Sequence, residues 1–84
     1  MNQCIVFDLP SGAGGMAAGM YKGNLIKELN NFCATHNIDY VAKSQRYEYK
    51  IWFNNTSHYT LFILGFSWRG VWRHPRLKDE NYEP

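Results

Sequence analysis

The chain has 84 residues, which is enough for one domain and leaves no room for a second hydrophobic core. Aromatic residues make up 17% of the chain and charged residues 19%, a balance that argues against intrinsic disorder. The formal net charge of +2 is too small to indicate nucleic-acid binding by itself. These figures favour a small folded domain of modest stability.

The N-terminal residues lack the basic start and the long apolar run of a secretion signal. No apolar stretch approaches the roughly 20 residues that a membrane-spanning helix needs. Without secretion, Cys4 and Cys33 are expected to be free thiols in a reducing compartment. We therefore expect a cytoplasmic protein with no membrane partner.

The first half of the chain has the pattern of a strand followed by a helix. Residues 4–7 are apolar on both faces, which predicts a strand inside a sheet. Residues 24–36 carry apolar side chains at helical spacing, so that one face of a helix collects them. The members of this face are Leu25, Ile26, Leu29, Phe32 and Cys33. Asn37 is suited to end the helix in the left-handed conformation.

Residues 11–23 stay open between helix and loop. Gly15, Gly19 and Gly23 recur every four residues and form one smooth stripe if the segment is helical. Such a stripe favours close packing on the sheet, and the alternative is a flexible loop. The sequence does not decide between the two.

The second half of the chain is predicted to be mostly antiparallel strands. Residues 38–53 alternate, with Tyr47, Tyr49, Ile51 and Phe53 on an apolar face and Arg46, Glu48, Lys50 and Trp52 on an exposed one. Residues 43–46 divide this region into two strands. Residues 54–57 are polar and predict a hairpin connection, and residues 59–68 a central strand. Residues 71–74 add a short edge strand, and the chain from Arg76 onward is expected to be a tail.

Together these elements predict an α+β fold of the type β-α-β-β(-β). We expect a single domain over residues 1–78, with a mostly antiparallel sheet and one amphipathic helix packed on one face. Residues 79–84 contain Asp79, Glu80 and Glu83 and are expected to form an acidic tail.

Three patterns resemble chemical sites but lack supporting residues. Residues 12–17 fit the glycine pattern of a phosphate loop, yet 84 residues cannot hold a dinucleotide fold and no P-loop lysine follows. Cys33 and His36 have metal-ligand spacing without a second pair. Ser57 with His58, or Cys4 with a histidine, has no flanking signature of a nucleophile. We expect no catalytic residue, no cofactor and no metal.

The strongest candidate for a functional site is the stretch from 67 to 78, which combines two tryptophans with four cationic side chains and no acidic one. Residues 69–78 carry a charge of +4, whereas residues 1–68 carry five positive and four negative side chains, or +1. Arg and Trp are the residues that most often anchor a partner. The predicted partner-binding residues are Trp68, Arg69, Trp72, Arg73, His74, Arg76 and Lys78.

This composition favours a small non-enzymatic protein-interaction module. Domains of this size are common among phage and mobile-element proteins, so we expect an inhibitor or regulator that masks a larger protein or nucleoprotein with an acidic surface, such as a host nuclease. The alternative is a nucleic-acid-binding protein whose aromatic rings stack on bases. Its candidate residues are Tyr47, Tyr49, Trp52, Trp68, Arg69 and Arg73. Monomer and homodimer both stay open.

Overall fold

The computed structural model describes residues 3–8, 15–66 and 75–83. In chain order they form β1 (Gln3–Asp8), α1 (Gly15–Thr35), β2 (Tyr40–Ser44), β3 (Glu48–Phe53), α2 (Thr56–Gly65) and β4 (Arg76–Asp79). The strands make one antiparallel sheet in the order β2-β3-β1-β4. This is the split βαβ arrangement of ferredoxin-like folds. The predicted class, a small α+β domain with an antiparallel sheet, is confirmed.

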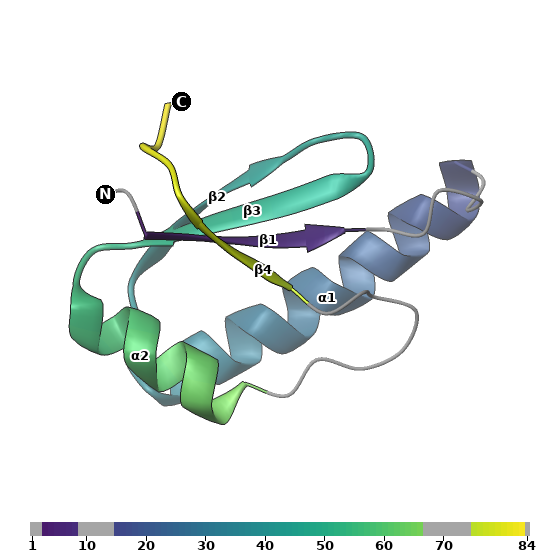
Figure 1. Ribbon diagram of the computed structural model, residues 1–84. Helices are drawn as coiled ribbons and strands as arrows, with labels where there is room; N and C mark the ends of the chain where they lie inside the picture. Colours follow the sequence, from purple (N-terminus) through teal and green to yellow (C-terminus); the bar gives the residue numbers. More distant parts are fainter. Residues whose placement is uncertain (1–2, 9–14, 67–74, 84) are drawn as a thin grey trace.

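Both helices cover the same face of the sheet, as Figure 1 shows. The core between the layers joins side chains of β1 and β3 to the inner faces of α1 and α2. Phe62 of α2 lies at its centre, with its ring centroid 6.5 Å from that of Phe7 and 5.2 Å from that of Phe53. The buried members are Ile5, Phe7, Leu25, Leu29, Cys33, Ile38, Tyr49, Ile51, Phe53, Phe62 and Phe66. The predicted inner face of α1 is therefore confirmed, with Ile26 and Phe32 packed against this cluster.

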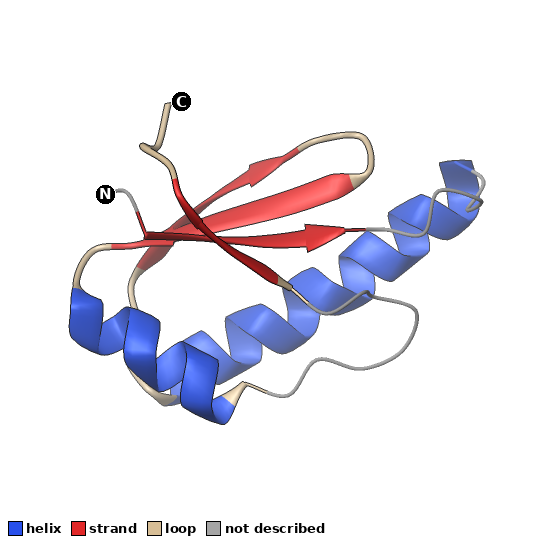
Figure 2. Cartoon of the chain, in the orientation of Figure 1, coloured by secondary structure: helices blue, strands red, loops and turns tan. Residues whose placement is uncertain are grey.

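The opposite face of the sheet, which we call the open face, carries no helix of the described chain (Figure 2). A smaller cluster lies on it, formed by Cys4, Val6 and Trp52. Val41 and Tyr82 pack against this cluster. β1 lies between β3 and β4 in the sheet, and its side chains belong to the clusters on both faces, so the prediction of an inner strand is correct.

The prediction that residues 59–68 form a central strand is wrong, because residues 56–65 are helix α2. The expected hairpin at residues 54–57 is wrong for the same reason. The Asn55 side chain accepts a hydrogen bond from the backbone N–H of His58, which caps the new helix. The apolar residues of the 59–68 segment fit both the two-residue period of a strand and the 3.6-residue period of a helix. The helical form is favoured because one helix is too small to cover one face of a four-stranded sheet. The fold therefore has two helices among the described residues instead of one.

Helix α1 begins at Gly15, so the described part of the open stretch 11–23 is helical. The interpretation of the glycine stripe as close packing on the sheet is wrong, since a Cβ added at Gly19 or Gly23 would meet nothing within 4 Å. Gly65 of α2 is the close contact instead, because a Cβ there would lie 2.8 Å from Phe32 Cζ. Asn37 follows the helix with φ 54°, as predicted.

The turn between β2 and β3 confirms that residues 43–46 divide two strands; it is closed by a 2.9 Å hydrogen bond from the backbone N–H of Gln45 to the carbonyl of Glu48. The expectation of a tail from Arg76 is wrong for Arg76–Asp79, which pair with β1 as an edge strand. The predicted edge strand at residues 71–74 lies outside the described residues.

Candidate functional site

Two of the predicted partner-binding residues, Arg76 and Lys78, lie on β4 with their backbone opposite Val6 and Cys4 of β1. Side chains on a strand alternate between faces, so both belong to the open face. The other predicted members lie outside the described residues. They are Trp68, Arg69, Trp72, Arg73 and His74.

Arg76 is held by acidic side chains of the same chain. Its Nε donates to Asp8 Oδ2 at 2.9 Å and its Nη2 to Asp8 Oδ1 at 3.1 Å, a bidentate pair. Nη2 also lies 3.7 Å from Glu48 Oε2. The guanidinium thus has two carboxylates beside it while the Arg76 side chain remains 52% exposed, so its contact with a partner stays a prediction.

Strand register places four cationic side chains in a compact group on the open face. One row across the sheet runs Lys43, Lys50, Val6 and Arg76, and the next runs Val41, Trp52, Cys4 and Lys78. The three lysines therefore come from three different strands: Lys43 and Lys50 lie in the row next to that of Trp52, and Lys78 lies in the row of Trp52 with Cys4 between them. Since Arg76 is paired with Asp8, the three lysines are the cations that this face offers to other groups.

The chain after β4 folds back over this group. The Trp52 indole N–H donates to the carbonyl oxygen of Glu80 at 2.7 Å, and the Tyr82 ring stacks on the indole with centroids 5.1 Å apart and planes at 16°. The Glu80 carboxylate lies 3.3 Å from Lys50 Nζ and 3.9 Å from Lys78 Nζ. The expected acidic tail thus contacts the sheet at Glu80 and Tyr82.

A polar hollow of about 280 Å³ lies between the returning segment and strands β2 and β3. Its lining combines the ammonium groups of Lys43 and Lys50 with the carboxylates of Glu80 and Glu83, so these charges balance while the C-terminal segment is in place. The residues are Lys43, Gln45, Lys50, Trp52, Glu80, Asn81 and Glu83. The sequence suggested that the acidic tail could shield the basic cluster within the chain, but it did not indicate that Glu80 would lie beside Lys50 or that Tyr82 would stack on Trp52.

The exposed face predicted for β3 is wrong at two positions: Lys50 is 9% exposed and Trp52 is 2% exposed. Of the base-stacking candidates, Tyr49 is buried in the core under the helices, whereas Tyr47 is exposed with the Arg46 guanidinium 5.4 Å from its ring centroid. Among the described candidates for nucleic acid, Trp52 on the open face and Tyr47 at the β2–β3 turn therefore remain, whereas Trp68, Arg69 and Arg73 lie outside the described residues.

A second exposed surface is the outer face of α2, where Leu64 is 81% and Leu61 is 42% exposed. The two leucines are three residues apart and share one side of the helix. They line a shallow hollow of about 360 Å³ together with Thr56, Ser57 and Thr60. Helix α2 contains no Asp, Glu, Lys or Arg, so Leu61 and Leu64 lie on a helix without acidic or strongly basic side chains.

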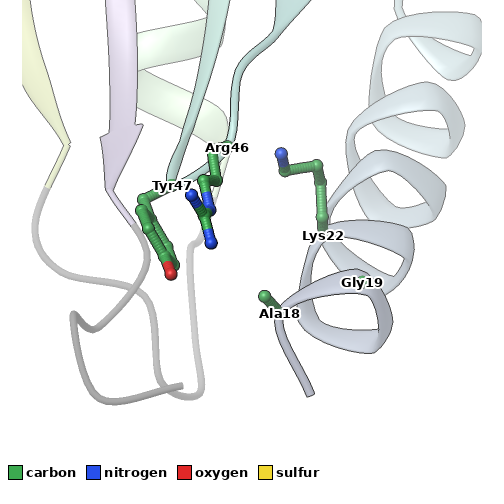
Figure 3. Close-up of a pocket in the computed structure, with 5 residues that line it drawn as sticks. All are labelled: Ala18, Gly19, Lys22, Arg46 and Tyr47. Atoms are coloured by element: carbon green, nitrogen blue, oxygen red, sulfur yellow. The ribbon is translucent and has the colours of Figure 1, made fainter. Parts of the chain in front are cut away.

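Near the first turns of α1, Lys22 and Arg46 approach the same hollow, which Ala18, Gly19 and Tyr47 also line (Figure 3). The Lys22 ammonium already donates to Ser44 Oγ at 3.0 Å and to the Gln45 carbonyl. Residues 12–14 of the phosphate-loop pattern lie outside the described residues. The remaining members, from Gly15 to Ala17, are part of α1 and bring no further cation to this hollow.

The described cysteines and histidines do not form a reactive centre. Burial raises the pKa of the Cys4 and Cys33 thiols to about 11, so both are protonated and unreactive near neutral pH. His36 is exposed beside the Phe32 ring, and His58 Nδ1 accepts a 3.2 Å hydrogen bond from the Asp39 backbone N–H. Among the described residues, no group of three or more His, Cys, Asp or Glu side chains is placed to hold a metal ion.

Comparison of the chain with protein-family models, with curated proteins and with solved structures found no match in any of the three. Within residues 3–8, 15–66 and 75–83, neither helix is long and apolar enough to cross a membrane. What the fold and its surfaces define is a small α+β domain with a covered cationic face and an uncovered apolar helix.

Proposed function

We propose that the chain is a non-enzymatic protein-interaction module that masks part of a larger protein. The observation that carries the proposal is the outer face of α2, which exposes Leu61 and Leu64 on a helix without charged residues. A helix on the surface of a globular protein usually carries charged side chains on its outer side. Exposing these two leucines to water is unfavourable, whereas burying them in an apolar groove of a partner is favourable.

The form of the helix favours insertion into a groove of a larger partner. Ten residues of helix are about 15 Å long. A flat symmetric contact between two copies needs about 800 Å² from each partner, which so short a face does not supply. A groove whose walls enclose the helix uses both leucines as anchors at i and i+3.

Affinity capture from a lysate of the source cells, with and without nuclease treatment, tests the proposal. The parent chain is expected to retain a protein in stoichiometric amount. Leu64→Glu places a charge at the centre of the contact and is expected to abolish retention, since Leu64 is exposed and its replacement leaves the core intact.

Met20→Glu is the matched control, because Met20 is 61% exposed on α1, away from α2. It is expected to retain the partner as the parent does. Equal retention by Leu64→Glu would place the contact elsewhere, and recovery of nucleic acid alone would reject the interaction module. Sedimentation equilibrium of the purified chain reports whether the occupant of α2 is a second copy instead.

A further inference from the structure

The returning C-terminal segment, residues 80–83, occupies the open face with the groups that a nucleotide would bring. A carboxylate lies between two lysines, where a phosphate would be bound. Two residues later an aromatic ring stacks on Trp52, where an unpaired base would stack. The Trp52 indole N–H is satisfied by a carbonyl oxygen, an acceptor that thymine, uracil, cytosine and guanine also carry.

The charges of the face agree with a covered anion site. Its strand residues carry four positive side chains, from Lys43, Lys50, Arg76 and Lys78, and two negative ones, from Asp8 and Glu48, which leaves +2. Glu80 and Glu83 of the returning segment add −2 and bring the sum to zero. The segment therefore neutralises the charge that would attract a polyanion.

The contacts of the segment with the face are few and partly exposed. The Glu80 side chain is 38% exposed, and the Lys43 ammonium reaches the Glu83 carbonyl at 3.4 Å. Displacing the segment would break one stacked ring pair, one indole hydrogen bond and ion pairs in contact with solvent. A ligand that supplies the same groups would replace each of them.

We propose that the open face is a binding site for single-stranded nucleic acid, and that residues 80–83 act as a built-in competitor that closes it. Lys43, Lys50 and Lys78 contact phosphates, and Trp52 stacks one base after Tyr82 has left. The site takes a single strand because stacking on an indole needs the face of an unpaired base. This site is independent of the protein contact proposed for α2, which lies on the other side of the sheet.

Fluorescence anisotropy with a labelled oligothymidine of about ten nucleotides tests the proposal. In the full-length chain, Tyr82→Ala removes the competing ring and Glu80→Gln removes the competing charge. Each is expected to tighten binding, by about fivefold or more for Tyr82→Ala, since the weakest stacking contacts between a ring and a base contribute about that factor. Circular dichroism of each variant confirms that the fold is kept, and Glu80→Gln alters no packing volume.

Three controls make the result specific. Glu83→Gln removes the same charge as Glu80→Gln from a side chain outside the lysine pairs, and it is expected to change affinity less. In the Tyr82→Ala background, Lys43→Gln is expected to reverse most of the gain, whereas Lys27→Gln on α1 is expected to leave it unchanged. A duplex of the same length is expected to bind more weakly than the single strand.

The proposal is overturned if neither Tyr82→Ala nor Glu80→Gln binds the oligonucleotide more tightly than the parent. It is also overturned if the gain survives Lys43→Gln, or if the duplex binds as well as the single strand. A direct readout is the indole N–H resonance of Trp52, identified by its loss in Trp52→Phe. Saturating oligonucleotide is expected to shift this resonance, because the ligand displaces the Glu80 carbonyl, and an unshifted resonance would place the oligonucleotide elsewhere.

Discussion

Trp52 of β3 and Tyr82 of the C-terminal segment stack with ring centroids 5.1 Å apart and planes at 16°. The indole is 2% exposed in this arrangement, although it lies on the face of the sheet that has no described helix. Tyr82→Ala is expected to lower the free energy of unfolding by about 1 kcal/mol or more, from lost stacking and newly exposed indole surface. Urea denaturation measures the difference. Tyr47→Ala is the matched control, and it is expected to change stability by less than about 0.5 kcal/mol because Tyr47 is 39% exposed.

The assignment of residues 56–65 to a helix can be tested at two positions whose burial differs between a helix and a strand. On a strand, Phe62 and Leu64 share one face, whereas on the helix Phe62 is fully buried and Leu64 is 81% exposed. Phe62→Ala is expected to cost about 3–5 kcal/mol of stability. Leu64→Ala is expected to cost less than about 0.5 kcal/mol. Similar losses in chemical denaturation at both positions would contradict the helix.

Strands β1, β2 and β3 and the part of α1 from residue 24 onward could be predicted because each has one dominant pattern. The inner face of α1 repeats every three to four residues through Leu25, Leu29 and Cys33, and β1 is apolar on both faces. Gln45 lies in a short polar segment between two apolar ones, which is the pattern of a turn between strands. In these segments local preference and tertiary packing agree.

The assignment of residues 56–65 failed because their pattern fits both periods. Tyr59, Phe62, Ile63 and Phe66 fall at i, i+3, i+4 and i+7, yet Phe62, Leu64 and Phe66 also alternate. The deciding signal is Asn55, which reads as a turn residue but serves as a helix cap. An apolar run of this length can be assigned only when the number of strands in the sheet is known.

The open face could not be predicted because its parts are far apart in the chain. Lys43, Lys50 and Lys78 come from three strands and become neighbours only through the sheet register. The composition of residues 79–84 suggested an acidic tail that shields the basic cluster or contacts a basic partner, but not which side chains of the sheet it would meet. Of the predicted site, Arg76 and Lys78 reach this face, and Arg76 is already paired with Asp8.

Glycine substitutions in the two helices are expected to have opposite signs. Gly19→Ala adds a methyl group into open space on α1 and should raise the free energy of unfolding by about 0.5–1 kcal/mol, because alanine favours helix more than glycine does. Gly65→Ala would place its Cβ 2.8 Å from Phe32 Cζ, and it should lower stability because the Phe32 ring packs against Phe62 and Phe66. Thermal unfolding of both variants checks this, and a stabilised Gly65→Ala would contradict the close packing of α1 on α2.

Stability is expected to fall at alkaline pH because both thiols are buried in their protonated form. Their pKa is about 11 in the folded chain and about 9.0 ordinarily, so between these values the unfolded chain has lost protons that the folded chain keeps. The unfolded state then binds fewer protons, and the free energy of unfolding falls as pH rises, by at most about 1.4 kcal/mol per pH unit for each thiol. This loss of stability is absent below about pH 8, because the thiols are then protonated in both the folded and the unfolded chain.

Urea denaturation at pH 8, 9, 10 and 11 measures this dependence. Burial also raises the pKa of Tyr40 to about 12, and this shift lowers stability in the same way above pH 10. The effect of the thiols is therefore measured as the difference in slope between the parent and the cysteine variants. Cys33→Ala lowers stability at every pH through the cavity it leaves, but it should remove about half of the thiol-linked slope between pH 9 and 10. A variant that also carries Cys4→Ala should remove the rest. An unchanged slope in that double variant would show that the thiols ionise as readily in the folded chain as in the unfolded one.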